Sequence, residues 1–126
     1  MLDLIKSLGF SIKKNKTNNS VVIKKKKIKT FASYSLVKTM RAGILVLGPL
    51  VTKYRKATTS LPGGCLIGAR PVNIHLNVLK KLGMKHQIKK GYIYANAKKG
   101  LKGSIIKFPK ISVGATENAI LAATLA

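Results

Sequence analysis

The 126-residue chain is strongly basic: it has 25 Lys and Arg residues against two acids, Asp3 and Glu117, and a formal net charge of +23. Its length suits the core of one domain, and 46% apolar residues is an ordinary share for a globular protein. A single cysteine, Cys65, excludes an internal disulfide and a cysteine-based zinc site, and it indicates a reducing compartment. The longest apolar stretch, residues 42–51, is about half a membrane span. No signal-peptide pattern opens the sequence, so we expect a cytoplasmic protein.

Basic charge of this size is typical of proteins that bind nucleic acids or anionic surfaces. Only three of the 25 cations are arginine, the residue that dominates base recognition, and the aromatic residues do not alternate with the lysines as stacking platforms would. The lysines are spread along the chain with one block at residues 24–27, and a lysine-rich coding background explains this pattern equally well. We therefore expect only salt-sensitive, non-specific binding to nucleic acid.

The first half of the chain predicts two helices. Residues 4–9 are amphipathic and end in a glycine, and an extended run follows at residues 21–23. Residues 39–47 are apolar on most faces and rich in small residues, which predicts a helix buried within the domain.

Residues 61–71 form a glycine-rich loop that combines one thiol, Cys65, with one guanidinium, Arg70. Glycines let the backbone approach a ligand closely, and Pro71 suits the first turn of a helix. Because a helix N-terminus favours anions and stabilises a thiolate, this loop predicts a functional site. The alternative is a cysteine that is only a small buried side chain, which fits poorly with the proline and glycines before it.

The second half repeats the pattern of the first. An amphipathic helix from Val72 to a capping Gly83 is followed by an extended run at residues 92–95 and an apolar helix at residues 116–125. The pattern of residues 4–9 returns at the end of the amphipathic helix, and the two apolar helices are related by nearly the same offset. We interpret this as a duplicated mixed unit of about 75 residues. Two unrelated helices with similar ends are the alternative.

The two ends of the chain differ from those of a complete domain. No strand precedes the first helix for it to cover, and residues 119–126 form an apolar helix without a capping glycine or polar turn. Unpaired carbonyls and an exposed core face would remain there. We therefore expect an incomplete domain, cut at both ends.

Three ordered motifs carry a resemblance to a known family. They are Lys38-Thr39-Met40-Arg41-Ala42, then Leu61-Pro62-Gly63-Gly64-Cys65 with Ile67-Gly68-Ala69-Arg70-Pro71-Val72, and Ser112-Val113-Gly114-Ala115-Thr116-Glu117-Asn118. Together they resemble the UDP-N-acetylglucosamine enolpyruvyl transferases over nearly the whole chain. The sister family, the enolpyruvylshikimate phosphate synthases, shares the fold but does not use this cysteine loop.

The resemblance implies an α/β (α+β) fold, the inside-out α/β barrel of the enolpyruvyl transferases, built from repeated βαβαββ units and incomplete here. Residues 1–126 would form part of one domain. Within it, residues 1–30 would end one unit, residues 31–105 would form a full unit with the Cys65 loop, and residues 106–126 would start a third.

The function implied by the resemblance is transfer of the enolpyruvyl group of phosphoenolpyruvate to the 3-hydroxyl of UDP-N-acetylglucosamine, the first committed step of peptidoglycan synthesis. It involves no cofactor and no metal. The family site lies between two domains, and an early segment that binds phosphoenolpyruvate would precede Met1. We therefore expect no turnover from this chain alone, although a separate chain could supply the missing domain. The alternatives are a non-catalytic remnant and a basic nucleic-acid-binding protein.

The resemblance also assigns site residues. Cys65 matches the family's general acid, which fosfomycin alkylates. Arg41 matches an arginine that contacts the sugar nucleotide, and Arg70 matches an arginine that both substrates contact. Further substrate-binding positions are Pro71, Val72, Asn73, Ile74, Lys110, Ile111, Ser112 and Val113. The family usually has aspartate where this chain has Asn73, so a contact made through that carboxylate is altered. No motif singles out His75, Lys85 or His86.

Overall fold

The computed structural model describes residues 1–63 and 72–126. The elements in chain order are α1 (Leu2–Ser7), β1 (Phe10–Asn15), β2 (Ser20–Lys25), β3 (Phe31–Ala32), α2 (Tyr34–Val37), the 3-10 helix η1 (Arg41–Val46), α3 (Leu47–Tyr54), β4 (Lys56–Ser60), α4 (Asn73–Lys81), β5 (Lys85–Lys89), β6 (Tyr92–Asn96) and α5 (Val113–Ala123). From β3 to β6 the order is strand, helices, strand, helix and two strands. This is the βαβαββ order expected from the resemblance, and the mixed α/β fold class is confirmed.

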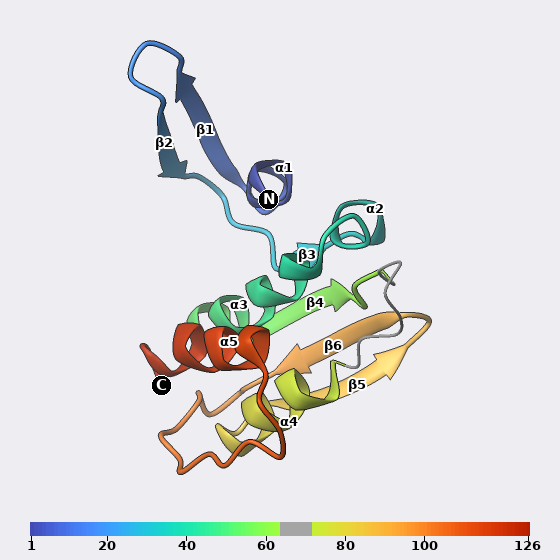
Figure 1. Ribbon diagram of the computed structural model, residues 1–126. Coiled ribbons are helices and arrows are strands. Elements are labelled where there is room, and N and C mark those ends of the chain that lie inside the picture. The colour runs from blue at the N-terminus through green and yellow to red at the C-terminus, as the bar shows by residue number, and fades with distance from the viewer. Residues whose placement is uncertain (64–71) are drawn as a thin grey trace.

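A four-stranded sheet has the order β3-β4-β6-β5, and in Figure 1 its strands β4, β6 and β5 lie beside α3, α4 and α5. β3 and β4 are parallel, whereas β6 pairs antiparallel with both β4 and β5. In β6 the side chains of Ile93 and Ala95 are buried and that of Tyr94 is exposed, the alternation of a sheet with one covered face. Helices α3 and α4 contact this sheet, and α5 packs against both helices.

The core lies between the sheet and these helices. Val51 of α3, Leu79 of α4 and Ile93 of β6 are each 0% exposed and belong to one hydrophobic cluster. A smaller cluster joins Ile74 and Val78 of α4 to alanines of α5. Because burial of apolar surface is the main stabilising contribution to folding, these two clusters hold α3, α4 and α5 in place around the site described below.

The predicted helix at residues 39–47 is wrong in type and extent. Residues 41–46 form the 3-10 helix η1, and Leu47 begins α3, which continues to Tyr54. Pro49 is the third residue of α3, where its missing N–H costs no intrahelical hydrogen bond, so the helix runs through the proline. The residue that follows the helix, Arg55, has a left-handed φ of 63°.

The predicted amphipathic helices and extended runs are confirmed. Gly9 and Gly83 follow α1 and α4 with φ of +96° and +102°, angles that glycine adopts without strain. A β-hairpin follows each helix: β1–β2 contains the predicted run at residues 21–23, and β5–β6 contains the run at residues 92–95. The division of the chain into the end of one unit, one full unit and the start of a third remains a prediction.

The apolar helix α5 is buried on one face only. Its Ala115, Asn118 and Ala122 are each 0% exposed where α3 and α4 pack against it, whereas Ile120 is 59% exposed. An apolar pattern on most faces predicts a helix buried within the domain, whereas in this structure one side of α5 is exposed. Of the helices in the described ranges, none is long and apolar enough to cross a membrane.

Candidate functional site

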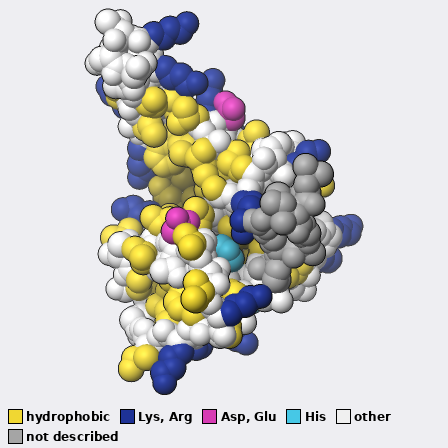
Figure 2. Space-filling view, viewed as in Figure 1, with side chains coloured by type: hydrophobic (Ala, Val, Ile, Leu, Met, Phe, Trp, Pro, Cys, Tyr) yellow, Lys and Arg dark blue, Asp and Glu magenta, His cyan; other side chains and the backbone are white. Residues whose placement is uncertain are grey.

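A cavity of about 550 Å³ opens where η1 and the first turns of α4 and α5 meet. It is lined by Arg41, Ala42, Ile44, Leu45, Pro62, Gly63, Val72, Ile74, His75, Lys110, Ile111, Ser112, Val113, Gly114 and Glu117. A volume of this size is typical of small-molecule sites. On the face drawn in Figure 2, a histidine side chain (cyan) reaches the surface, with an acidic side chain (magenta) and basic side chains (dark blue) close to it in this view.

Most of the predicted substrate-binding residues in the described part of the chain line this cavity. Arg41 comes from η1, Val72 and Ile74 from the start of α4, and residues 110–113 from the segment that enters α5. Asn73 is different, because its side chain is exposed at the start of α4 and it is not among the lining residues. The structure therefore brings together segments that are far apart in the sequence.

Three predicted site residues, Cys65, Arg70 and Pro71, lie outside the described residues. The segment that carries them is flanked by Gly63 and Val72, and both of these flanking residues line the cavity.

The N-terminus of α5 forms one wall of the cavity. Ser112 is its N-cap: the hydroxyl oxygen accepts a hydrogen bond from the N–H of Ala115 over 3.4 Å, and the carbonyl oxygen accepts one from the N–H of Thr116 over 3.0 Å. The first N–H groups of an α-helix have no intrahelical partners, and here they belong to Val113 and Gly114. With Arg41 and Lys110 on the same cavity, this end of α5 favours a bound anion.

His75, which no motif singled out, also lines the cavity. Its Nδ1 lies 3.3 Å from Nδ2 of Asn118, a fully buried side chain of α5. The available sequence signal was its spacing: His75 follows Val72 by three residues, and residues three apart lie on the same side of a helix.

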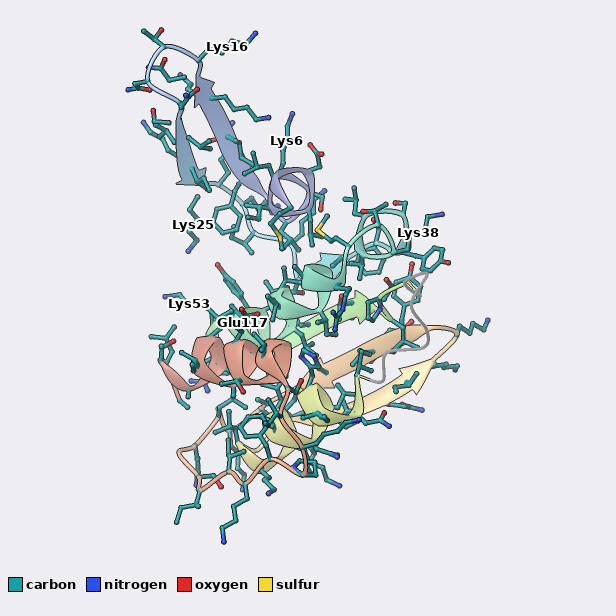
Figure 3. The ribbon with its side chains drawn as sticks, viewed as in Figure 1. Lys6, Lys16, Lys25, Lys38, Lys53 and Glu117 are labelled. Atoms are coloured by element: carbon teal, nitrogen blue, oxygen red, sulfur yellow. The ribbon has the colours of Figure 1, made fainter. Side chains whose placement is uncertain are left out.

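The surroundings of His75 favour its neutral form. Burial lowers the pKa of the imidazole below its ordinary value, the positive charge of Arg41 lowers the pKa further, and Glu117 acts in the opposite direction. Glu117 comes from α5 (Figure 3). The cavity thus combines an imidazole whose neutral form is favoured with the basic side chains of Arg41 and Lys110 and the acidic side chain of Glu117. In the described part of the chain, no group of three or more His, Cys, Asp or Glu side chains could hold a metal ion.

The family model of EPSP synthase (3-phosphoshikimate 1-carboxyvinyltransferase) matches residues 1–126. The UDP-N-acetylglucosamine 1-carboxyvinyltransferase of Pelagibacter ubique is 65% identical to this chain over 127 residues, and that of Wolinella succinogenes is 48% identical over 126. Both comparisons cover 100% of this chain and 30% of the relative, so the chain spans less than a third of their length. Among solved structures, the enolpyruvyl transferase NikO from Streptomyces tendae matches the fold with a TM-score of 0.73 and 17% identity, over 95% of this chain and 28% of that one.

Proposed function

Since the chain belongs to the EPSP synthase family, we propose that its cavity binds UDP-N-acetylglucosamine as part of an enolpyruvyl transferase. The reaction moves the enolpyruvyl group of phosphoenolpyruvate to the 3-hydroxyl of the sugar, in the cytoplasm, as the first committed step of peptidoglycan synthesis. The 65% identity with a UDP-N-acetylglucosamine 1-carboxyvinyltransferase and the cysteine loop support this acceptor over shikimate phosphate. The activity is proposed for an enzyme with the length of these relatives, of which this chain provides one part.

One observation carries the proposal: three separate motifs of the resemblance meet at one cavity. Arg41, the pair Val72 and Ile74, and the Lys110–Val113 segment are distant in sequence, yet all line the same space. Residues that only happened to match a family pattern would have no reason to share a cavity.

The lining residues fit a nucleotide sugar chemically. Arg41, Lys110 and the free N–H groups at the start of α5 are suited to the diphosphate, because guanidinium, ammonium and helix N-terminal groups all stabilise phosphate oxygens. Val72 and Ile74 are 8% and 7% exposed and provide an apolar wall for the uridine.

The proposed chemistry is an addition followed by an elimination. In the addition, Cys65 donates a proton to the vinyl CH₂ carbon of phosphoenolpyruvate, and the sugar 3-oxygen bonds to the central carbon and gives its proton to a base outside this chain. In the elimination, the new methyl group returns a proton to the Cys65 thiolate, the double bond re-forms, and the bond from carbon to the phosphate oxygen breaks to release phosphate. Fosfomycin would alkylate the same thiol.

Thermal unfolding with and without UDP-N-acetylglucosamine tests the binding proposal. A ligand that binds only the native state raises the melting temperature, and at about 100 times Kd it adds roughly 2.7 kcal/mol of stability. We expect a raised melting temperature for the chain and for Arg55→Gln, and roughly ten- to hundred-fold weaker binding for Arg41→Gln, since a lost charged hydrogen bond costs about 1.5–3 kcal/mol. Both variants lose the same charge, but Arg55 is not among the cavity residues. Equal weakening in both variants, or no ligand effect at all, would overturn the proposal.

Phosphate release with both substrates tests the catalytic part. We expect no sustained release from this chain alone, because preorganised groups from a second domain are required. A polypeptide carrying the rest of the Pelagibacter ubique relative should restore release if this chain is a working part of an enzyme. Failure of that polypeptide to restore release, with nucleotide binding intact, would favour a non-catalytic remnant.

A further inference from the structure

Asn118 connects three elements around the cavity. Its Oδ1 accepts a hydrogen bond from the N–H of Gly48 at the start of α3 over 3.1 Å, and its Nδ2 donates to the carbonyl oxygen of Ile44 in η1 over 3.2 Å. The same Nδ2 lies 3.3 Å from Nδ1 of His75 on α4. The side chain is 0% exposed, so its amide pairs with protein groups rather than with solvent.

The backbone determines the orientation of this amide. A backbone N–H can only donate and a carbonyl oxygen can only accept, so Gly48 must face the oxygen of Asn118 and Ile44 must face its nitrogen. The reversed amide would place two donors together at Gly48 and two acceptors together at Ile44, and each buried group left unpaired costs about 1–3 kcal/mol.

The orientation of Asn118 in turn determines which nitrogen of His75 carries the proton. Nδ2 has two hydrogens, one directed to Ile44 and the other available to His75. Nδ1 of His75 must therefore accept, and a neutral imidazole that accepts at Nδ1 carries its hydrogen on Nε2.

The Cε1–Nε2 edge of the His75 ring faces the start of α5. A Cβ on Gly114 would lie 3.3 Å from Cε1 and 3.6 Å from Nε2 of His75, so the absence of a side chain there leaves the Nε2–H next to the first turn of the helix. This is the part of the cavity where Ser112 and the free N–H groups favour an anion.

We infer that Asn118 is a positioning residue of the cavity: it holds His75 as the Nε2–H tautomer, which donates a hydrogen bond to a phosphate oxygen of the bound nucleotide sugar. The identity of the ligand rests on the proposed function, whereas the tautomer does not. A neutral donor adds geometric selectivity at the start of α5 without adding a third positive charge to Arg41 and Lys110.

Nitrogen NMR of the ¹⁵N-histidine-labelled chain without ligand tests the tautomer directly. Protonated and unprotonated imidazole nitrogens have distinct chemical shifts, and a His86→Gln variant assigns the signals because the chain has two histidines. We expect Nδ1 of His75 to be unprotonated and Nε2 protonated at neutral pH. A proton on Nδ1, or averaging between the two tautomers as in free histidine, would overturn the inference.

Two matched variants test the donor with UDP-N-acetylglucosamine as the probe. In His75→Gln the amide nitrogen can occupy the place of Nε2 and donate, whereas in His75→Asn the shorter side chain leaves that place empty. We expect near-normal affinity for His75→Gln and roughly ten-fold weaker binding for His75→Asn, the effect of one hydrogen bond to a charged group. Equal losses in both would contradict a donor at Nε2.

Asn118→Asp tests the positioning role itself. A carboxylate only accepts, so the proton of His75 should move to Nδ1 and the nitrogen NMR pattern should reverse. An unchanged pattern in a folded Asn118→Asp variant would contradict the role, and the wild-type spectrum decides the tautomer if this variant does not fold. A correct tautomer without any binding of UDP-N-acetylglucosamine would instead count against the proposed function alone.

Discussion

The backbone N–H of Gly48 donates a hydrogen bond to Asn118 Oδ1, 70 residues later in the chain. A Cβ on Gly48 would meet that oxygen and would also lie 2.9 Å from the carbonyl oxygen of Asn118 and 3.2 Å from Cβ of Ala122. Thr52 lies at the same contact: its one hydroxyl hydrogen is shared between the carbonyl oxygens of Gly48, 2.8 Å away, and of Ala122, 3.1 Å away. Helices α3 and α5 therefore pack closely at a position that only glycine fits, and this contact supports the wall of the cavity.

Replacing Gly48 by alanine should destabilise the fold. The added methyl group must displace both the buried amide of Asn118 and the backbone of α5, and overpacking of this kind costs roughly 1–3 kcal/mol. Urea unfolding measures the change in free energy. Gly103→Ala is the control, because a Cβ there meets no atom within 4 Å. Similar stability losses in both variants would contradict the close packing of α3 and α5.

Stability should fall on the acidic side of neutrality because of His75. Burial holds the pKa of His75 below its ordinary value of 6.5, so the unfolded chain takes up this proton more readily than the folded chain. The stability that the neutral His75 contributes to the folded state is complete above pH 6.5, and it is lost as the pH falls through the lower pKa of the folded state. Urea unfolding at several pH values should show this slope in the chain and in His86→Gln, and a smaller slope in His75→Gln. An unchanged slope in His75→Gln would contradict the assignment.

Replacing Cys65 by serine should separate binding from chemistry. A serine hydroxyl is a much weaker acid than a thiol, and loss of a general acid typically lowers turnover by about 10²–10⁴. Phosphate release in the reconstituted enzyme should fall by this factor, whereas the affinity for UDP-N-acetylglucosamine should stay within about two-fold. Loss of nucleotide affinity as well would indicate a structural role for Cys65.

The β1–β2 hairpin should open more readily than the four-stranded sheet. Within the described ranges β1 and β2 pair only with each other, and Val21, Val22 and Ile23 are 44–47% exposed. A two-stranded hairpin is marginally stable by itself, and Figure 1 shows it projecting away from the sheet. Amide hydrogen exchange should be faster in β1 and β2 than in β4 and β6. Equal protection in both sheets would contradict this expectation.

The lysines of the hairpin should bind nucleic acid without specificity. Lys16 lies at the tip of the hairpin, away from Glu117 on α5 (Figure 3). Replacing Lys13, Lys16 and Lys24 by glutamine should weaken binding to random duplex DNA. The binding should also depend less on salt: the slope of log affinity against log salt concentration should become shallower by at most about 0.9 for each phosphate contact that is lost. Lys25 is kept, because its Nζ lies 5.8 Å from the ring centroid of Tyr54. Affinity for UDP-N-acetylglucosamine should not change, and DNA binding that resists salt would support the nucleic-acid alternative.

Local features of the fold could be predicted from the sequence. Helical periodicity and the glycines at positions 9 and 83 identify α1, α4 and their ends, because a left-handed C-terminal residue depends on neighbouring backbone alone. The 3-10 helix before α3 and the short strand β3 were not predicted. Strand pairing and the switch from 3-10 to α geometry depend on partners distant in the sequence, and intrinsic propensity does not include them.

The sequence by itself determined the family and pointed to several of the residues that line the cavity, because motifs such as Lys38–Ala42 and Ser112–Asn118 are runs of consecutive residues that can be read without a structure. Only the tertiary structure decided that these motifs meet around one space and that His75 joins them. The partners of Asn118 at Gly48 and His75 are 70 and 43 residues away, so no local pattern reveals them. Packing of α5 against α3 and α4 brings Asn118 to these partners and so decides which hydrogen bonds form beside the cavity.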